Sequence, residues 1–217
     1  MRYLSMGKNM SPRDIAKVLI EKNCVQLSIN PPFTYASGLK GPIYCDNRLV
    51  WSHIDARQKI IDAFKNVSSE KNLEFDAFCG LATAGIPHAS ILAWEIKKPL
   101  LYVRGGSKSH GKQNQVEGDV RPGMKVLLVE DLVNQGKSLG DAVIAVKSVG
   151  LEPVGCLTIV DYQTSGARAV LKEHDLMLHS LTNFESLLQE AESQGTLSAT
   201  DVEAIKTWHQ DPKAWSV

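Results

Sequence analysis

Several features that define whole classes of protein are absent from this sequence of 217 residues. Its four cysteines form no C-x-x-C pair, which argues against both a disulfide framework and a zinc site. They are Cys24, Cys45, Cys79 and Cys156. The first 25 residues contain no apolar signal core and no apolar run reaches 18 residues, so neither secretion nor a membrane span is supported. We therefore expect reduced cysteines in a cytoplasmic protein.

An excess of charge of one sign is absent too. The chain contains 24 lysines and arginines against 24 aspartates and glutamates. This balance provides no overall attraction for nucleic acid or for an anionic membrane, so neither is an expected partner. Hydrophobic residues make up 43% of the chain and charged residues 22%, which is typical of a globular protein with a real core. The length predicts one domain, with room for an appended arm.

Apolar periodicity predicts alternating strands and helices through the middle of the chain. Helices are expected at 12–23, after the N-cap Ser11, and at 53–67, 85–96 and 138–149. Strands are expected at 25–29, 43–45, 75–79, 100–103, 126–129 and 154–160. The tail, 183–215, has a helical pattern. This alternation favours an α/β fold with a mainly parallel sheet and helices on both faces.

The segment 126–138 carries the first functional signal, with the sequence VLLVEDLVNQGKS. The expected strand ends at Glu130 and Asp131, and ligands of α/β sheets bind at the carboxyl ends of strands. Residues 134–138 would lead into a helix N-terminus, which favours phosphate. The plain alternative is a strand-to-helix turn with solvated acids. A P-loop is excluded, because Asp131 stands where its first glycine is required.

Four stretches together resemble the orotate phosphoribosyltransferases, which are type I phosphoribosyltransferases. Segment 126–138 resembles their loop for phosphoribosyl pyrophosphate (PRPP), and 80–89, GLATAGIPHA, falls where the family holds pyrophosphate. Segment 32–48, PFTYASGLKGPIYCDNR, resembles the substrate segment, and 102–118, YVRGGSKSHGKQNQVEG, the mobile catalytic loop. All four occur in family order and spacing, and the resemblance extends over roughly residues 12 to 210.

The resemblance implies a fold, a reaction and partners. It implies one phosphoribosyltransferase domain over 1–217, with an N-terminal hood at about 1–50, a core at about 51–180 and C-terminal helices at about 181–217. The implied enzyme is a glycosyltransferase of pyrimidine biosynthesis that converts orotate and PRPP to orotidine 5′-monophosphate and pyrophosphate. The implied cofactor is magnesium, carried by PRPP near Asp131 with no direct protein ligand set. The implied assembly is a homodimer with the catalytic loop shared across subunits.

The resemblance also implies roles for individual residues. The expected catalytic residues are Lys108, His110 and Asp131. Expected at PRPP and pyrophosphate are Thr83, Ala84, Gly85, Arg104, Lys112, Glu130, Asn134, Gln135, Gly136, Lys137 and Ser138. Expected at orotate are Tyr35, Tyr44, Asp46, Arg48 and Asn134. Such a reaction leaves a cationic ribose and a highly charged leaving group, so catalysis is expected to rest on electrostatic stabilisation and positioning.

Simpler alternatives stay open for several of these residues. Arg48 could form a surface ion pair with Asp46, and Tyr35 could belong to the core. Many relatives carry hydroxyls where this chain has Asn134 and Gln135, which raises the question of how the turn binds phosphate. We expect Lys137 to contact the phosphate; it could instead fill the empty site or point into solvent. The alternatives to the enzyme are a regulatory protein of the same fold and a transferase for another nucleobase.

Overall fold

A computed structural model describes residues 9–35, 38–105 and 115–212. The described residues divide into two compact units. The first, called the core unit here, contains Asn9 and residues 58–181. The second, called the hood unit, contains residues 10–57 and 182–212. Each is described separately below.

The core unit is built on a six-stranded sheet with the order β10-β9-β8-β5-β6-β7. The strands are β5 (Ala77–Leu81), β6 (Leu100–Val103), β7 (Val116–Glu117), β8 (Lys125–Val133), β9 (Glu152–Asp161) and β10 (Leu178–Asn183). The pairs β6–β5, β5–β8 and β8–β9 are parallel, while β6 and β7 are antiparallel. The expected α/β class with a mainly parallel sheet is confirmed.

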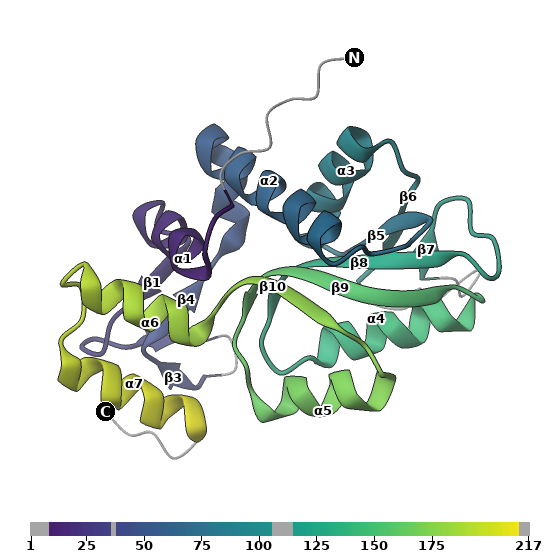
Figure 1. Cartoon of the computed structure of the whole chain (residues 1–217). Helices are drawn as coiled ribbons and strands as arrows, with labels where there is room; N and C mark the ends of the chain where they lie inside the picture. Colours follow the sequence, from purple (N-terminus) through teal and green to yellow (C-terminus); the bar gives the residue numbers. More distant parts are fainter. Residues whose placement is uncertain (1–8, 36–37, 106–114, 213–217) are drawn as a thin grey trace. The chain divides into compact units, whose positions relative to one another are not determined.

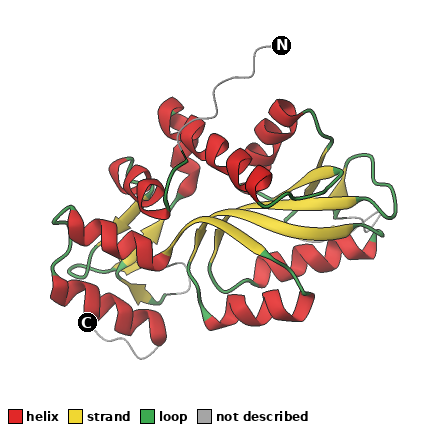
Figure 2. Cartoon of the chain, viewed as in Figure 1, coloured by secondary structure: helices red, strands yellow, loops and turns green. Residues whose placement is uncertain are grey.

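Helices cover both faces of this sheet (Figures 1 and 2). Most of α2 (Ile54–Glu70) and all of α3 (Gly85–Ile96) lie over one face, and α4 (Lys137–Ser148) and α5 (Ser165–His174) over the other. Successive residues of β5 point to opposite faces of the sheet. Cys79 and Leu81 pack into the core formed with α4, while a side chain on Gly80 would collide with Ile86 of α3. The wholly apolar pattern of β5 follows from this two-sided burial.

The hood unit consists of short strands and helices. Its elements are α1 (Pro12–Glu21), β1 (Val25–Leu27), β2 (Phe33–Thr34), β3 (Lys40–Gly41), β4 (Ile43–Cys45), the 3-10 helix η1 (Asn47–Ser52), α6 (Phe184–Ser193) and α7 (Ala199–Gln210). Two antiparallel pairs, β1–β4 and β2–β3, contain two or three residues a strand. Arg13 of α1 pairs with Glu190 of α6 at 3.1 Å, which links the two ends of the sequence within this unit.

The structure differs from the sequence expectation at several elements, including β2, β3, β7 and η1, which were not expected. The strand expected at 126–129 continues to Val133, because β9 remains paired with it as far as Val133 and Asp161. Helix α5 and strand β10 were not expected, since α5 opens with Ser-Gly and β10 is half polar. The helical tail is two helices, and Gly195, with φ +71°, lies in the turn between them.

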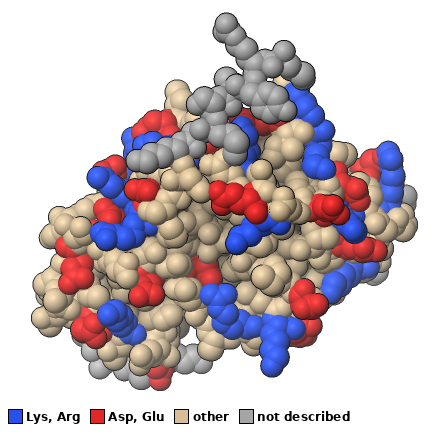
Figure 3. Space-filling model, viewed as in Figure 1, with Lys and Arg blue, Asp and Glu red and all other residues tan. Residues whose placement is uncertain are grey.

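The surface carries charges of both signs. On the face shown in Figure 3, lysine and arginine side chains are interspersed with aspartate and glutamate side chains. This mixture agrees with the formal net charge of zero. Across the described residues, none of the helices has both the length and the apolar character that crossing a membrane requires.

Candidate active site

Glu130 and Asp131 lie inside β8, not beyond its end. This corrects the sequence expectation, which placed the end of the strand before them. The neighbouring strand β5 pairs with β8 only as far as Gly80 and Val129, so Glu130 is the first β8 residue beyond that pairing. On its other side it remains paired, with Thr158 of β9. The acids therefore stand where one neighbouring strand has ended and the other still holds the backbone in place.

The Glu130 side chain is buried and lies beside a second carboxyl group, that of Asp131. Its side chain is on a residue only 8% exposed, and its Oε1 accepts a hydrogen bond of 2.9 Å from the Asp131 N–H. Burial, together with the neighbouring Asp131 carboxylate, raises the pKa of Glu130 well above its usual value. A cationic or hydroxyl-bearing ligand would relieve this penalty. This pair therefore favours a ligand that offers positive charge or hydrogen-bond donors.

The turn after β5 brings helix α3 against β8. The peptide bond between Ala82 and Thr83 is cis, and α3 begins at Gly85. A side chain on Gly85 would collide with the carbonyl oxygen of Val129, so only glycine permits this approach. No side chain caps the α3 N-terminus. The dipole of α3 consequently favours an anion at this turn, where pyrophosphate was expected, although Pro87 has no N–H and the Ile86 N–H donates to the Thr83 carbonyl at 3.4 Å.

The turn after β8, residues 134–136, leads into α4 in a similar way. Gly136 is the N-cap residue of α4, with φ +79°, and no side chain caps this helix. Lys137, the first helical residue, is 84% exposed at its side chain and pairs with Asp141 at 2.7 Å. In the described structure its ammonium group therefore interacts with the helix surface. We call residues 134–138 the phosphate turn.

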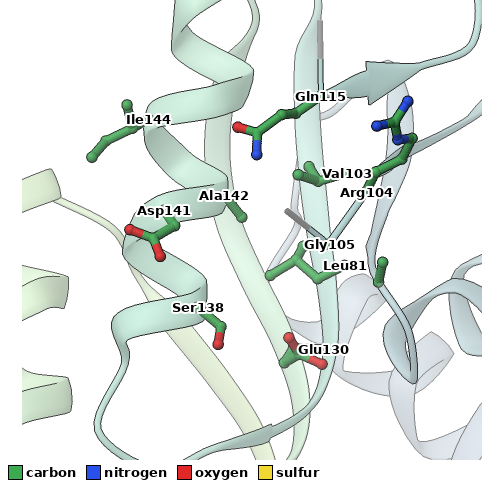
Figure 4. A pocket seen from close by; sticks show the side chains of 11 residues that line it. Leu81, Val103, Arg104, Gly105, Gln115, Glu130, Ser138, Asp141, Ala142 and Ile144 are labelled. Carbon is green, nitrogen blue, oxygen red and sulfur yellow. The ribbon is translucent and has the colours of Figure 1, made fainter. Parts of the chain in front are cut away.

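Two cavities meet at Glu130. The larger, of about 490 Å³, lies between α4 and the β5–β6–β8 edge, and Figure 4 shows the side chains around it. Its lining comprises Leu81, Ala82, Val103, Arg104, Gly105, Gln115, Glu130, Ser138, Asp141, Ala142 and Ile144. The smaller, of about 210 Å³, is lined by residues 132–139 together with Glu130. One carboxylate thus borders both the phosphate turn and the space beside Arg104.

Arg104 follows β6 and is held by the short β6–β7 hairpin. Its N–H donates to the Gln115 carbonyl at 2.9 Å, and its guanidinium pairs with Glu117 at 3.2 Å. In Figure 4 this guanidinium points away from Glu130 and Ser138. Arg104 therefore lines the large cavity while its charge is compensated by Glu117. Contact with a pyrophosphate would require a change of rotamer.

The remaining predicted lid residues, Lys108, His110 and Lys112, lie outside the described residues. Their predicted roles stay predictions. Sequence reasoning missed Gln115, Asp141 and Ile144 of the cavity lining. Only Asp141 had a usable signal, since it stands four residues after Lys137 on a predicted helix.

The predicted orotate residues, apart from Asn134, belong to the hood unit. Arg48 makes two hydrogen bonds to Asp46, at 2.6 and 2.8 Å, and this bonding lowers the pKa of Asp46. The surface ion pair that was the alternative for Arg48 is thus present. Tyr35 donates to the Ile43 carbonyl at 2.6 Å and packs against Gly41, and burial raises its pKa to about 12. Tyr44 is 41% exposed.

Metal ligation was expected to come through PRPP. Within the described ranges, no three or more His, Cys, Asp or Glu side chains gather as a metal site. Glu130 and Asp131 nevertheless fit a nearby magnesium ion, because carboxylate oxygens suit this hard cation, and a cation beside Glu130 would counter the rise in its pKa that burial and Asp131 cause.

Comparison with known proteins agrees with this geometry. Residues 50–188 match the profile of the phosphoribosyl transferase domain. An orotate phosphoribosyltransferase of Coxiella burnetii is 39% identical over 93% of this chain and 97% of its own length. One from Listeria monocytogenes is 38% identical over 94% of this chain and 97% of its own. The chain belongs to the orotate phosphoribosyltransferase family.

Solved structures of this family show the same fold. The orotate phosphoribosyltransferase of Aeropyrum pernix superposes with a TM-score of 0.73 at 28% identity, over 85% of this chain and 99% of that one. The Mycobacterium tuberculosis enzyme in complex with PRPP superposes with a TM-score of 0.64 at 25% identity, over 81% and 98% of the two chains. The central sheet described above is therefore the sheet of a type I phosphoribosyltransferase.

Proposed function

We propose that this protein is an orotate phosphoribosyltransferase, which transfers the phosphoribosyl group of PRPP to orotate and releases pyrophosphate. The observation that carries the proposal is Glu130, which borders both cavities. A molecule with phosphate at one end, hydroxyls in its middle and pyrophosphate at the other matches that order. The phosphate turn would hold the 5′-phosphate, Glu130 and Asp131 the ribose hydroxyls, and the turn at Ala82–Gly85 the pyrophosphate.

The chemistry follows from these positions. As the bond between C1 of the ribose and the pyrophosphate oxygen breaks, its electron pair leaves with pyrophosphate and the ribose becomes cationic. A nitrogen lone pair of orotate then forms the new bond to C1, and the proton of that nitrogen is released to solvent. Asp131 provides negative charge beside the ribose, Glu130 forms a hydrogen bond with a ribose hydroxyl, and the α3 N-terminus with Arg104 stabilises the leaving group. The groups that interact with the developing charges are thus attached to a rigid sheet edge.

Magnesium supplies charge neutralisation of pyrophosphate when it is bound with PRPP. Asp131 and Glu130 would stand beside it. This role is supported by the carboxylate pair, because carboxylate oxygens suit a hard cation. Arg48 is the proposed partner of the orotate carboxylate, which would replace Asp46 in its present ion pair.

The assembly and location belong to the same proposal. A homodimer in which Lys108 acts across the subunit boundary is supported by the resemblance of 102–118 to the family's catalytic loop. A cytoplasmic location is supported by four cysteines that are free in the structure. Lys108, His110 and Lys112 would bring positive charge to pyrophosphate.

The direct test is loss of orotate absorbance on addition of PRPP and magnesium. Wild-type protein should consume orotate, and Lys108→Ala should lower turnover by orders of magnitude while PRPP binding persists, because its contact strengthens as charge develops. Near-normal turnover of Lys108→Ala would remove this lysine from the mechanism. Mixed dimers of Lys108→Ala and Asp131→Asn protomers should recover activity, and a verified heterodimer without recovery would contradict a shared site.

A PRPP-binding regulator of the same fold is the second candidate, favoured by the unusual phosphate turn at Asn134 and Gln135. It predicts PRPP binding without orotate consumption. A transferase for another nucleobase would instead consume that base with PRPP and leave orotate unchanged. Activity assays with each base in turn separate the three cases.

A further inference from the structure

The phosphate turn rests directly on the first turn of α5, although about 30 residues separate the two segments in the sequence. A side chain on Gly166 would collide with the side-chain oxygen of Gln135. A side chain on Gly136 would come within 3.0 Å of the Ala167 Cα. The two segments therefore approach each other with glycine on both sides of the contact.

One hydroxyl joins the two segments. Thr164, the N-cap residue of α5, is 8% exposed, and its Oγ1 donates a hydrogen bond of 2.5 Å to the Asn134 carbonyl. The same oxygen accepts the Ala167 N–H at 3.2 Å. A hydroxyl has one proton to donate and two lone pairs to accept with, so both bonds form at once.

The bond from Thr164 to the Asn134 carbonyl also fixes the direction of the Gln135 N–H, because the peptide unit that contains both groups is planar. In a trans peptide the carbonyl and the following N–H point in opposite directions. The Asn134 carbonyl points toward α5, where it accepts the hydrogen bond from the Thr164 hydroxyl. The Gln135 N–H of the same peptide unit is therefore directed away from α5. Residues on both sides of this peptide line the smaller cavity of about 210 Å³.

We propose that Thr164 is a positioning residue for the phosphate group, whose hydroxyl orients the Asn134–Gln135 peptide so that the Gln135 N–H donates to a bound phosphate monoester. Thr164 itself does not touch the ligand. The inference rests on the proposed function, which assigns the 5′-phosphate of PRPP to the phosphate turn. Gln135 lacks the hydroxyl that many relatives carry at this turn, but the proposal gives it a role. Its side chain packs on Gly166, and its backbone N–H binds the phosphate.

Three variants separate orientation from stability. Thr164→Val removes the proton and the cap with little change of shape, while Thr164→Ser keeps the hydroxyl. Ser198→Ala is the matched control, because Ser198 caps α7 in the hood unit through a bond of 3.1 Å from the Asp201 N–H. Both Thr164→Val and Ser198→Ala should lower the melting temperature through loss of a cap.

Calorimetric titration with ribose 5-phosphate measures the phosphate end alone. Thr164→Val should raise the Kd about tenfold or more, because a phosphate then loses an oriented donor. Thr164→Ser and Ser198→Ala should stay within about twofold of wild type. In steady-state assays, Thr164→Val should raise the KM for PRPP while kcat and the KM for orotate change little. Wild-type affinity in folded Thr164→Val overturns the proposal.

A measurement on the wild-type protein needs no variant to fold. The amide proton resonance of Gln135 should move downfield on titration with ribose 5-phosphate, while that of Gly195, in the hood unit, should not move. An unmoved Gln135 resonance at saturation, or no binding by wild type, overturns the proposal. Binding that depends on Thr164 in a protein that consumes no orotate would instead reject only the proposed function.

Discussion

Six of the helix N-termini in the described part of the chain are of two kinds. Those of α1, α5, α6 and α7 are closed by the side chains of Ser11, Thr164, Asn183 and Ser198, each of which accepts a backbone N–H. Those of α3 and α4 have no side-chain cap. The residues that would carry one are Ala84 and Gly136, neither of which has a side-chain acceptor.

The difference follows what each helix end faces. A capping oxygen occupies the position that an anion would take at free N–H groups. At α1 and α7 the cap is a full capping box, and stability is its only evident role. Residues at the α4 N-terminus line the two cavities instead, and Ala82, which lies two residues before the α3 N-cap, lines the larger one. We therefore expect the open ends of α3 and α4 to face the ligand, while the capping boxes of α1 and α7 belong to the scaffold.

We expect the largest effect from a substitution at Gly85, at the open end of α3. Gly85→Ala forces a methyl group against the Val129 carbonyl, which costs about 1–3 kcal/mol of unfolding free energy. It also displaces the open end of α3, so pyrophosphate affinity should fall about tenfold or more. Thermal unfolding and calorimetry with pyrophosphate measure the two effects. Unchanged pyrophosphate binding in a destabilised variant would show that the α3 N-terminus is part of the scaffold.

Glu130 should make the free energy of unfolding depend on pH. Because the pKa of Glu130 is raised in the folded state, the folded protein binds more protons than the unfolded chain above the ordinary value of 4.5. Its contribution to stability therefore falls as pH rises, at most by about 1.4 kcal/mol per pH unit. Glu130→Gln removes this slope, so its stability relative to wild type should increase between pH 6.5 and 8.5.

A second buried group does not disturb this comparison. Burial lowers the pKa of His88 to about 3, but this histidine is present in both proteins, so its effect cancels in the difference between them. Urea unfolding of both proteins at several pH values gives the comparison. Parallel curves for wild type and Glu130→Gln would contradict a raised pKa. The variant should bind PRPP less tightly despite its greater stability.

A closed helix end should lose stability without losing ligand affinity, unlike Gly85. Ser11→Ala removes a capping box and should cost about 1 kcal/mol of unfolding free energy. PRPP binding should be unchanged, because this cap serves only the scaffold. Chemical denaturation and calorimetry on the same sample provide both readings. A loss of PRPP affinity comparable to that of Gly85→Ala would erase the distinction between the two kinds of end.

The smallest expected effect is at Lys137. Its ion pair with Asp141 is exposed, so Lys137→Ala should change stability by no more than a few tenths of a kcal/mol. PRPP affinity should fall several-fold if the ammonium leaves Asp141 for the phosphate. Tighter binding would mean that the lysine blocks the site, and unchanged binding that it stays in solvent.

Asp141→Asn sharpens this last prediction. Freeing Lys137 should tighten PRPP binding, but removing a negative charge from the cavity lining would do so too. The same substitution in a Lys137→Ala background isolates the second effect. A gain of equal size in both backgrounds would show that Lys137 has no contact with the phosphate.

Local signals in the sequence were sufficient for much of this site. The buried run before Glu130, the two acids and the glycine turn at Gly136 are contiguous, so strand, carboxylates and helix start could be predicted together. The Ser11 cap was likewise visible, because its partner Asp14 stands three residues away. Interactions within one turn or one strand involve residues that are close in the sequence, so the sequence alone is enough to predict them.

Tertiary packing decided the rest. Whether Arg48 faces Asp46, whether Arg104 is held by Glu117, and how far β8 continues depend on which partners the folded chain supplies. The Thr164 hydroxyl on the Asn134 carbonyl joins segments 30 residues apart and leaves no periodic trace in either. The need for glycine at position 85 arises only because the Val129 carbonyl of another strand lies against it. The sequence determined which groups are present in this site, and close packing between distant segments decided which way they point.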